Sequence, residues 1–266
     1  MPVIELKSDR EREHMRAAGQ VVGEVLKLLA ARVEPGLPTI ELDRLAAAEI
    51  RRRGAEPVFK GYQPSPRIPA YPATVCVSVN EEVIHGIPGS RRLKPGDLVS
   101  LDLGARVGGM VGDAALSVAV GGSPGDEAAR LLEVTERALW AGIHAVRVGG
   151  HVGDIGAAVQ AVVEGANFGV VREFVGHGVG REMHESPEVP NYGIAGRGAK
   201  IQPGMALAIE PMVTAGDWHL TVRPDGWTAA TMDGRWSCHF EHTVFVGRDG
   251  VEVLTATPPI VLDAVQ

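Results

Sequence analysis

Two histidines seven residues apart, His177 and His184, lie in a stretch that is unusually rich in glycine. Gly176, Gly178 and Gly180 surround the first of them. Glycines at this density let a backbone approach another group closely, or adopt dihedral angles that other residues avoid. The spacing also resembles a phosphate-binding loop, but no Lys-Ser/Thr follows it and no βαβ unit is evident, so we do not expect a nucleotide site. The question is then which groups the two histidines face.

Four carboxylates interrupt apolar runs that otherwise have the composition of buried strands: Asp102, Asp113, Glu210 and Glu241. A single interior carboxylate is most simply explained by an arginine partner or a backbone cap. Four of them together with His177 favour a pair of divalent cations, because several unpaired interior charges are strongly unfavourable. Four anions also balance two M²⁺ ions. Oxygen-rich coordination with one imidazole suits Mn, Fe(II), Co or Zn in a catalytic role and not a closed structural zinc site.

The remaining histidines and the cysteines show no comparable spacing. A single histidine without a partner is expected to be exposed or hydrogen-bonded, and this interpretation applies to His14, His144, His151, His219 and His239. His242 directly follows Glu241 and is expected beside the candidate metal site. Cys76 has no basic group near it in the sequence, so it is expected to be a small apolar wall and not a nucleophile.

The composition is that of an ordinary globular protein of 266 residues, with 45% hydrophobic and 22% charged residues. The net charge of −7 disfavours nucleic acid as the main partner, and the run Arg51-Arg52-Arg53 is expected to be the solvated end of a helix. Two cysteines provide no disulfide framework. The early charges at the N-terminus do not fit a secretory signal, and no apolar run reaches membrane-spanning length. We therefore expect a cytoplasmic protein.

Hydrophobic periodicity predicts two helices followed by strands. Ser8 and Glu11 form a capping-box pattern. The helix after them has apolar residues every three or four positions, at Met15, Ala18, Val22, Val25 and Leu29. Thr39 is predicted to cap a second helix that stops at Gly54. A proline-rich loop follows, and then β-like runs at residues 74–79, 98–103 and 116–120.

The same order of elements returns in the second part of the chain. Helical patterns around residues 131–143 and 155–163 precede β-like runs at 206–209 and 239–246. Residues 35–42 resemble 148–155, and residues 94–102 resemble 202–210, so the two copies end on Asp102 and Glu210. This repeat indicates an internally duplicated α/β protein with halves at about 8–122 and 123–250. Because each half contributes too little core alone, we expect one domain over residues 1–266 with a cleft between the halves.

The order of Asp102, Asp113, His177, Glu210 and Glu241 within their local motifs resembles the bacterial type I methionine aminopeptidases of metallopeptidase family M24. The most specific motifs are Asn80-Glu-Glu-Val-Ile-His85-Gly-Ile-Pro88, Gly176-His177-Gly-Val-Gly-Arg-Glu-Met-His184-Glu185 and Glu210-Pro211-Met212. The resemblance covers nearly the whole chain. It implies the pita-bread fold, in which duplicated helix-helix-strand halves surround a central antiparallel sheet. It also implies metal-dependent removal of the N-terminal methionine from nascent proteins and peptides, with a preference for a small second residue.

The resemblance also assigns roles to individual residues. It implies two divalent ions held by Asp102, Asp113, His177, Glu210 and Glu241, with Asp113 and Glu241 bridging. His85 and His184 are the implied catalytic histidines, and Glu210 is our candidate general base. The implied methionine pocket is lined by Tyr62, Tyr71, Cys76 and Trp227. The expected partners are nascent N-termini near the ribosome, with no nucleic acid and no membrane, and the protein is expected to be a monomer.

The chemistry of these residue types agrees with the resemblance. Two neighbouring divalent ions lower the pKa of a shared water and stabilise charge on the substrate oxygen. His184 is suited to stabilise the oxyanion and His85 to assist the leaving amine. An open coordination position beside Asp102 explains a requirement for a free N-terminal amine. The alternative for His85 is a turn residue that hydrogen-bonds only backbone in its His-Gly-Ile-Pro loop.

The sequence departs from the family pattern at two places. Residues 63–70 separate Tyr62 from Tyr71 by more than is usual, and Met183 replaces an aromatic residue common before His184. Three prolines among residues 63–70 predict a stiff rim at the cavity entrance, with the methionine side chain gripped deeper, near Cys76 and Trp227. Two alternatives to the aminopeptidase remain. One is an X-Pro aminopeptidase or prolidase, which usually carries an additional N-terminal domain; the other is an inactive peptide-binding module, which usually lacks ligands.

Overall fold

The helices and strands were assigned in a computed structural model, which describes residues 3–263. The helices are α1 (Asp9–Ala30), α2 (Thr39–Arg52), α3 (Asp126–His144) and α4 (Val152–Gly165). The strands of the first half are β1 (Glu56–Pro57), β2 (Cys76–Val79), β3 (Glu82–Ile84), β4 (Leu98–Val107) and β5 (Met110–Ala119). The later strands are β6 (Gly169–Val170), β7 (Gly176–Gly178), β8 (Glu185–Val189), β9 (Ala206–Ile209), β10 (Met212–Thr214), β11 (Leu220–Val222), β12 (Ala229–Thr231), β13 (Ser237–His239), β14 (Glu241–Val246), β15 (Gly250–Val253) and β16 (Ile260–Asp263).

The N-termini of the first two helices are formed in different ways. Ser8 and Glu11 make the predicted capping box, so the start of α1 is confirmed. The prediction for α2 was wrong: Thr39 is the first helical residue and Pro38 occupies the cap position. The Thr39 hydroxyl instead accepts a hydrogen bond from the Gly89 amide at 2.8 Å. Gly89 is fifty positions away in the sequence, and no local pattern indicates this contact.

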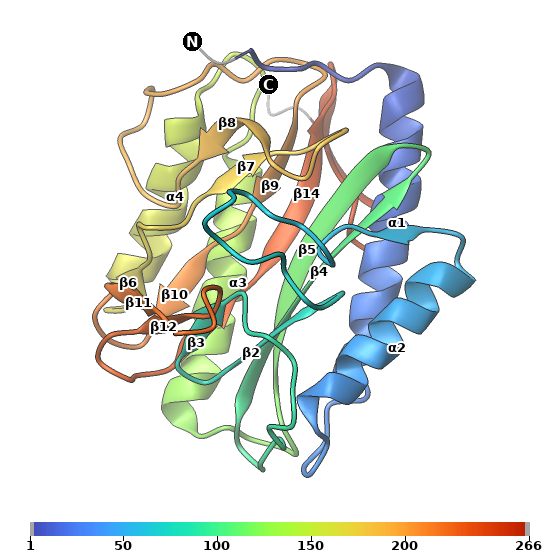
Figure 1. The fold of residues 1–266 in the computed structure, drawn as a ribbon. Helices are drawn as coiled ribbons and strands as arrows, with labels where there is room; N and C mark the ends of the chain where they lie inside the picture. Colours follow the sequence, from blue (N-terminus) through green and yellow to red (C-terminus); the bar gives the residue numbers. More distant parts are fainter. Residues whose placement is uncertain (1–2, 264–266) are drawn as a thin grey trace.

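A ten-stranded sheet joins the two halves of the chain (Figure 1). Its main strand order is β1-β4-β5-β14-β9-β7-β8, with β2 pairing with β4 and with β15 and β16 continuing from β14. The pairs along this path are antiparallel. Strand β14 is therefore the junction, since it pairs with β5 of the first half and with β9 of the second. Two three-stranded sheets, β13-β10-β6 and β11-β12-β3, complete the β-structure.

Side chains alternate between the two faces of the large sheet. Leu101, Leu103 and Ala105 of β4 pack with residues of α1 and α2 in one apolar cluster. Leu207 and Ile209 of β9 pack with residues of α3 and α4 in a second cluster. Because successive residues of a strand point to opposite faces, Asp102 and residue 208 are turned away from the helices. The four helices thus support one face of the sheet and leave the other for the candidate site.

The predicted strands are present with shifted boundaries, and only the run at 206–209 matches its strand, β9, in full. The run at 116–120 was predicted too short, because β5 begins at Met110 and pairs with β4 along its whole length. Gly112 and Asp113 concealed this strand in the sequence. The run at 239–246 is divided between β13 and β14. These differences move strand ends but keep every candidate ligand in or next to a strand.

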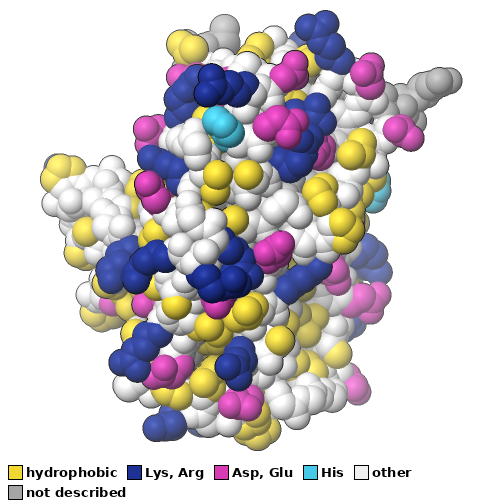
Figure 2. Space-filling view, turned by 90° about the vertical axis from the view of Figure 1, so that its right-hand side faces the viewer, with side chains coloured by type: hydrophobic (Ala, Val, Ile, Leu, Met, Phe, Trp, Pro, Cys, Tyr) yellow, Lys and Arg dark blue, Asp and Glu magenta, His cyan; other side chains and the backbone are white. Residues whose placement is uncertain are grey.

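Basic and acidic side chains are interspersed on the face that carries α1 and α2, as Figure 2 shows. Arg51, Arg52 and Arg53 lie at the end of α2, as predicted, and Arg52 and Arg53 pair with Glu49. This face therefore has no block of a single charge at the arginine run. Within residues 3–263, no helix combines the length and the apolar character that crossing a membrane requires.

Candidate active site

The five predicted metal ligands lie on the face of the sheet opposite the helices. Asp102 of β4 and Glu241 of β14 are both paired in register with Ala115 of β5, so the two carboxylates share one row across three strands. Asp113 lies two residues before Ala115 on the same face. Cross-strand partners project to the same side of a sheet. The hairpin β4–β5 and the central strand β14 therefore place three carboxylates next to one another.

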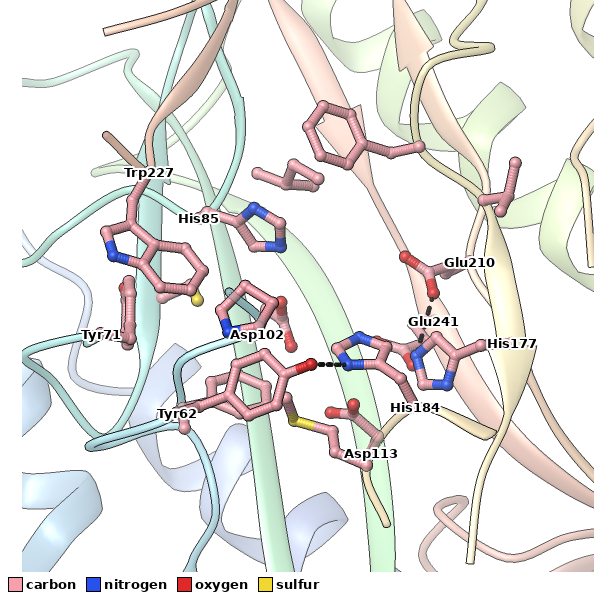
Figure 3. Close-up of a pocket in the computed structure, with 17 residues that line it drawn as sticks. Tyr62, Tyr71, His85, Asp102, Asp113, His177, His184, Glu210, Trp227 and Glu241 are labelled. Carbon is pink, nitrogen blue, oxygen red and sulfur yellow. Dashed lines mark hydrogen bonds and ion pairs between the residues drawn. The ribbon is translucent and has the colours of Figure 1, made fainter. Parts of the chain in front are cut away.

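The second half brings the remaining two residues to the same place. His177 of β7 is paired with Ala208 of β9, and Glu210 follows two positions later on the same face. The nearest ligand atoms of Asp113, His177 and Glu241 all lie within 4.8 Å of one another. The Nε2 atom of His177 is 3.4 Å from a carboxylate oxygen of Glu210. Figure 3 shows these side chains converging from strands of both halves.

The donor set fits divalent cations. Among residues 3–263, Oδ1 of Asp102, Oδ1 of Asp113 and Oε1 of Glu241 are buried and have no hydrogen-bond partner. Buried charged oxygens in that condition are strongly unfavourable in a folded protein. Carboxylate oxygens with one imidazole nitrogen are the ligands of catalytic divalent metals. A cation among these oxygens removes the cost of burying them unpaired.

Burial and mutual repulsion raise the pKa values of the clustered acids. Burial, followed by the charge of Asp113, raises the pKa of Asp102 well above its usual range. Burial raises the pKa of Asp113 to about 7. Burial and the neighbouring carboxylates also raise the pKa values of Glu210 and Glu241. In the absence of a cation, the fold thus favours the protonated acids, and a bound cation favours the charged ones.

The orientation of His177 is fixed by its own backbone. Its Nδ1 atom lies 2.9 Å from the Gly178 carbonyl oxygen, so Nδ1–H donates there and Nε2 faces the carboxylates. A register shift between His177 and Gly178 in the pairing of β7 with β8 bends the strand at this point. A Cβ atom at Gly178 would lie only 2.3 Å from the Ser186 carbonyl oxygen. The glycine next to the histidine therefore serves close strand packing.

Asp113 is also held by its backbone. The Thr243 hydroxyl accepts a hydrogen bond from the Asp113 amide at 3.0 Å and donates one to the Asp113 carbonyl at 2.7 Å. Thr243 belongs to β14, two residues after Glu241. One residue thus ties the strand of Glu241 to that of Asp113. Sequence reasoning missed Thr243 because a threonine in a strand carries no distinctive signal.

A cavity of about 310 Å³ adjoins the carboxylates. Its apolar end is the cluster of Phe59, Tyr71, Cys76, Met183 and Trp227. The Tyr71 hydroxyl donates to the Gly86 carbonyl at 2.9 Å, and the Trp227 indole N–H donates to the Pro69 carbonyl at 2.8 Å. Both aromatic rings therefore have their polar atoms satisfied by backbone. This end of the cavity suits an apolar side chain.

The predicted pocket residues and both predicted catalytic histidines line this cavity. His184 is at its exposed side, and the Tyr62 hydroxyl is 2.8 Å from its Nδ1 atom (Figure 3). The ring of His85 meets the edges of Trp227 and Phe174 at centroid distances of 5.8 and 5.5 Å. His85 has a positive φ of 59°, a conformation that residues other than glycine adopt mainly under constraint. Its pKa is lowered to about 4 by burial and by His184, so it is neutral at neutral pH.

The loop at residues 63–70 does not act apart from the apolar pocket. Pro64 lines the cavity, as expected of a rim. However, Pro69 supplies the acceptor for Trp227, and the Tyr71 amide donates to the Tyr62 carbonyl at 2.8 Å, which closes the loop at its base. The rim and the residues expected to grip methionine are therefore in contact, which the sequence did not indicate. A long-range hydrogen bond connects them.

His239 contradicts the expectation of an exposed or satisfied histidine. It is 1% exposed, and neither ring nitrogen has a hydrogen-bond partner within residues 3–263. Its Nε2 atom is 3.8 Å from a carboxylate oxygen of Glu210. Its position two residues before Glu241 was the only sequence indication. The expectation for His242 was wrong, because strand alternation turns its side chain away from Glu241 to the helix side of the sheet. Its ring packs against Trp140 of α3 at a centroid distance of 5.6 Å, and its Nδ1 atom is 2.8 Å from the Thr255 hydroxyl.

Comparisons with known proteins agree with this geometry. The family model of metallopeptidase family M24 matches residues 13–248. A methionine aminopeptidase of Clostridium perfringens is 47% identical over 253 residues, which cover 95% of this chain and 99% of that relative. The crystal structure of a methionine aminopeptidase from Thermotoga maritima superposes with a TM-score of 0.91 at 41% identity, covering 95% of this chain and 99% of that one.

A more distant structure shares the fold alone. The prolidase from Pyrococcus furiosus is 20% identical, with a TM-score of 0.74, and the match covers 94% of this chain and 65% of that one. The prediction of a pita-bread fold with a central antiparallel sheet is confirmed by these likenesses. The prediction of the family is confirmed as well.

Proposed function

This chain belongs to metallopeptidase family M24, and on that premise we propose that it is a metal-dependent aminopeptidase that removes N-terminal methionine from nascent proteins and peptides, favouring a small second residue. The observation that carries the proposal is one cavity in which candidate metal ligands adjoin an apolar pocket. The pocket accepts the methionine side chain, and the carboxylate cluster lies where the peptide bond of the same residue must be.

The position of Asp102 supports action at a free N-terminus. Asp102 is paired in register with Cys76, and Cys76 belongs to the apolar wall of the pocket. We propose that a residue whose side chain contacts that wall places its α-amine close to the Asp102 carboxylate. An internal residue of a polypeptide has no free amine to place there. The geometry thus supports an exopeptidase.

The candidate ligands fit divalent cations, and the family is metal-dependent. We propose two ions, held by Asp102, Asp113, His177, Glu210 and Glu241, with Asp113 and Glu241 shared between them. The native metal is proposed to be Co, Mn, Fe(II) or Zn. When bound, such ions supply Lewis acidity that polarises the scissile carbonyl and lowers the pKa of a water molecule.

The side chains of the chain perform the proton transfers and the positioning. Glu210 is the proposed general base, because its carboxylate lies inside the cluster and accepts a proton there. Burial lowers the pKa of His184, so its ring is neutral at neutral pH. When the Tyr62 hydroxyl donates to Nδ1 of His184, Nε2 carries the proton and can donate to the developing oxyanion. His85 is proposed to contact the scissile nitrogen and assist its departure.

The pKa values of the acids predict how metal affects stability at different pH values. The pKa of Asp113 is raised in the fold from 3.8 to about 7. Between these values the metal-free folded chain binds more protons than the unfolded chain, so its stability falls as pH rises through this window. Metal binding strengthens over the same window because the ligands must be deprotonated. The difference in Tm between metal-loaded and metal-free protein should therefore widen from pH 5 to pH 7.5, reaching roughly 10 °C.

Thermal melts at several pH values, with and without Mn²⁺ or Co²⁺, measure this difference. Bound metal is determined in parallel at each pH. A constant difference in Tm, or metal content unchanged at pH 4, contradicts the carboxylate-rich site.

A side-by-side assay tests the proposed activity. Metal-stripped protein is reconstituted and given Met-Ala-Ser and Ala-Pro as substrates. We expect cleavage of Met-Ala-Ser, and dependence on added metal. Cleavage of Ala-Pro alone favours the X-Pro aminopeptidase or prolidase alternative, and binding of peptide without any cleavage favours the inactive module. The comparisons do not favour either alternative.

We further propose that the protein acts in the cytoplasm on nascent chains near the ribosome, as a monomer, without a nucleic-acid or membrane partner. The net charge of −7 supports the absence of nucleic acid. Cys76 and Cys238 are both free and buried, as a reducing compartment allows.

A further inference from the structure

A buried ion pair joins the N-terminal segment (residues 3–8) to the active site. The side chain of Lys7 is 1% exposed and that of Glu185 is 9% exposed, and their charged groups are in contact. Lys7 Nζ also donates to the Glu5 carbonyl at 2.9 Å, and the Lys7 amide donates to the Gly204 carbonyl at 2.7 Å. Removing one member of such a pair leaves an uncompensated charge in the interior. The N-terminal segment and Glu185 are therefore held together firmly.

Glu185 directly follows His184 and begins β8, and its carboxylate organises the preceding loop at residues 180–184, the His184 loop. Oε1 of Glu185 accepts a hydrogen bond from the Glu182 amide at 3.1 Å. At the start of the loop, the Gly180 carbonyl accepts from the Val111 amide of β5 at 2.7 Å. The loop is thus attached to β5 at one end and to Lys7 at the other.

Gly180 allows the ion pair to pack against the loop. A Cβ atom there would lie 2.3 Å from Cε of Lys7 and 2.6 Å from Oε1 of Glu185. One of the glycines that follow His177, Gly180, thus makes room for the buried side chain of Lys7. Arg181 adds contacts with Glu5, at 2.8 Å, and with Glu11. Arg181 is 56% exposed, so these outer contacts contribute less than the buried pair.

The ring of His184 lies against two neighbouring rings, with centroid distances of 4.3 Å to His177 and 5.3 Å to Tyr62. It is exposed at the cavity, and its one hydrogen bond within the described residues is to the Tyr62 hydroxyl. These neighbours bound the space for the ring, and the backbone of the His184 loop sets where the side chain enters that space. We propose that the Lys7–Glu185 ion pair positions His184 for catalysis, so that the N-terminal segment forms part of the active-site machinery. This inference rests on the proposed function, in which His184 donates to the oxyanion.

The test is the kinetics of Lys7→Met, which removes the charge while keeping most of the side-chain volume. We expect kcat on Met-Ala-Ser to fall roughly 10–100-fold, because small displacements of a catalytic group have effects of this size. KM should change by less than about three-fold, because the apolar pocket is untouched. Metal content, measured in the same samples, should be unchanged. A kcat equal to that of the wild type in folded, metal-loaded Lys7→Met protein overturns the proposal.

Repeating the substitution in a His184→Ala variant distinguishes a positioning effect on His184 from a general disturbance of the active site. In His184→Ala, the ring that Lys7 positions is absent, so adding Lys7→Met should cause no further loss of kcat. An equal loss in both backgrounds contradicts the proposal. Should Lys7→Met fail to fold, the double variant Lys7→Met/Glu185→Met removes both charges, a replacement that buried pairs often tolerate. We expect the double variant to lose as much kcat as Lys7→Met. Adding the double variant to His184→Ala should cause no further loss of kcat. A double variant with the kcat of the wild type overturns the proposal.

Glu252→Gln is the matched control. Glu252 is a carboxylate with a side-chain exposure of 3% on β15, and Arg12 and Arg16 of α1 pair with it away from the cavity. This variant should lower stability and leave kcat within about two-fold. A kcat loss in Glu252→Gln as large as that in Lys7→Met means that any broken buried pair has this effect, and this also overturns the proposal. A wild-type protein that does not cleave Met-Ala-Ser refutes the proposed function itself.

Discussion

Asp113→Asn should lose metal and lower kcat/KM by roughly 10³-fold or more, while the protein stays folded. The carboxamide keeps the shape of the side chain but supplies no charged oxygen for the two proposed ions to share. The fold should persist because Thr243 holds Asp113 through its backbone amide and carbonyl, which the replacement does not change. The variant also removes one of the charges that repel one another in the buried cluster. At pH 8, metal-free Asp113→Asn should therefore melt at a higher temperature than the metal-free wild type.

Three measurements check this expectation: bound metal per chain, kcat/KM on Met-Ala-Ser, and Tm with and without metal. Asp217→Asn is the control, because it makes the same chemical change at an exposed surface residue. Near-normal kcat in Asp113→Asn would rule out a shared carboxylate. A lower Tm for the metal-free variant would show that Asp113 has a stabilising partner other than a cation.

His184→Ala and His85→Ala should each lower kcat/KM by roughly 10²–10⁴-fold with bound metal unchanged. Both rings line the cavity beside the candidate ligands. The ring centroid of His184 is 4.3 Å from that of His177, so metal content must be measured in each variant and not assumed.

His144→Ala is a suitable control for these variants. His144 is exposed at the end of α3, where its Nδ1 atom is 2.6 Å from the Trp140 carbonyl oxygen. Its replacement should change kcat/KM by less than about two-fold. Stoichiometric loss of metal in His184→Ala or His85→Ala would identify that residue as a ligand instead of a catalyst.

The parts of the fold that were predictable from the sequence are those with local causes. The capping box of Ser8 and Glu11 is complete within four residues, and the start of α1 follows from it. The candidate ligands were also recognisable, because a carboxylate within an apolar strand is unusual wherever it occurs. Their common face follows from strand alternation once the pairing of β4, β5 and β14 is known.

The parts that sequence reasoning missed depend on contacts between distant segments. Thr39 bonds with Gly89, Trp227 with Pro69, and Lys7 with Glu185. Each of these residues has an ordinary local interpretation as a cap, a pocket wall or a surface charge. Tertiary contacts decide whether such a residue bonds within its own segment or with a distant one. The periodicity of a single segment carries no information about tertiary contacts.

The position of strand β14 in the sheet has a consequence for folding during synthesis. Strand β14 leaves the ribosome after β1 to β13, yet it lies in the middle of the large sheet between β5 and β9. Until it inserts, the two halves share no strand of that path, and Glu241 has not joined Asp102 and Asp113. Pairings between such distant segments form slowly. The joining of the two halves of the sheet and the assembly of the proposed cation ligands are therefore one event, so that a nascent copy of this chain brings all five candidate ligands together only after β14 has been made.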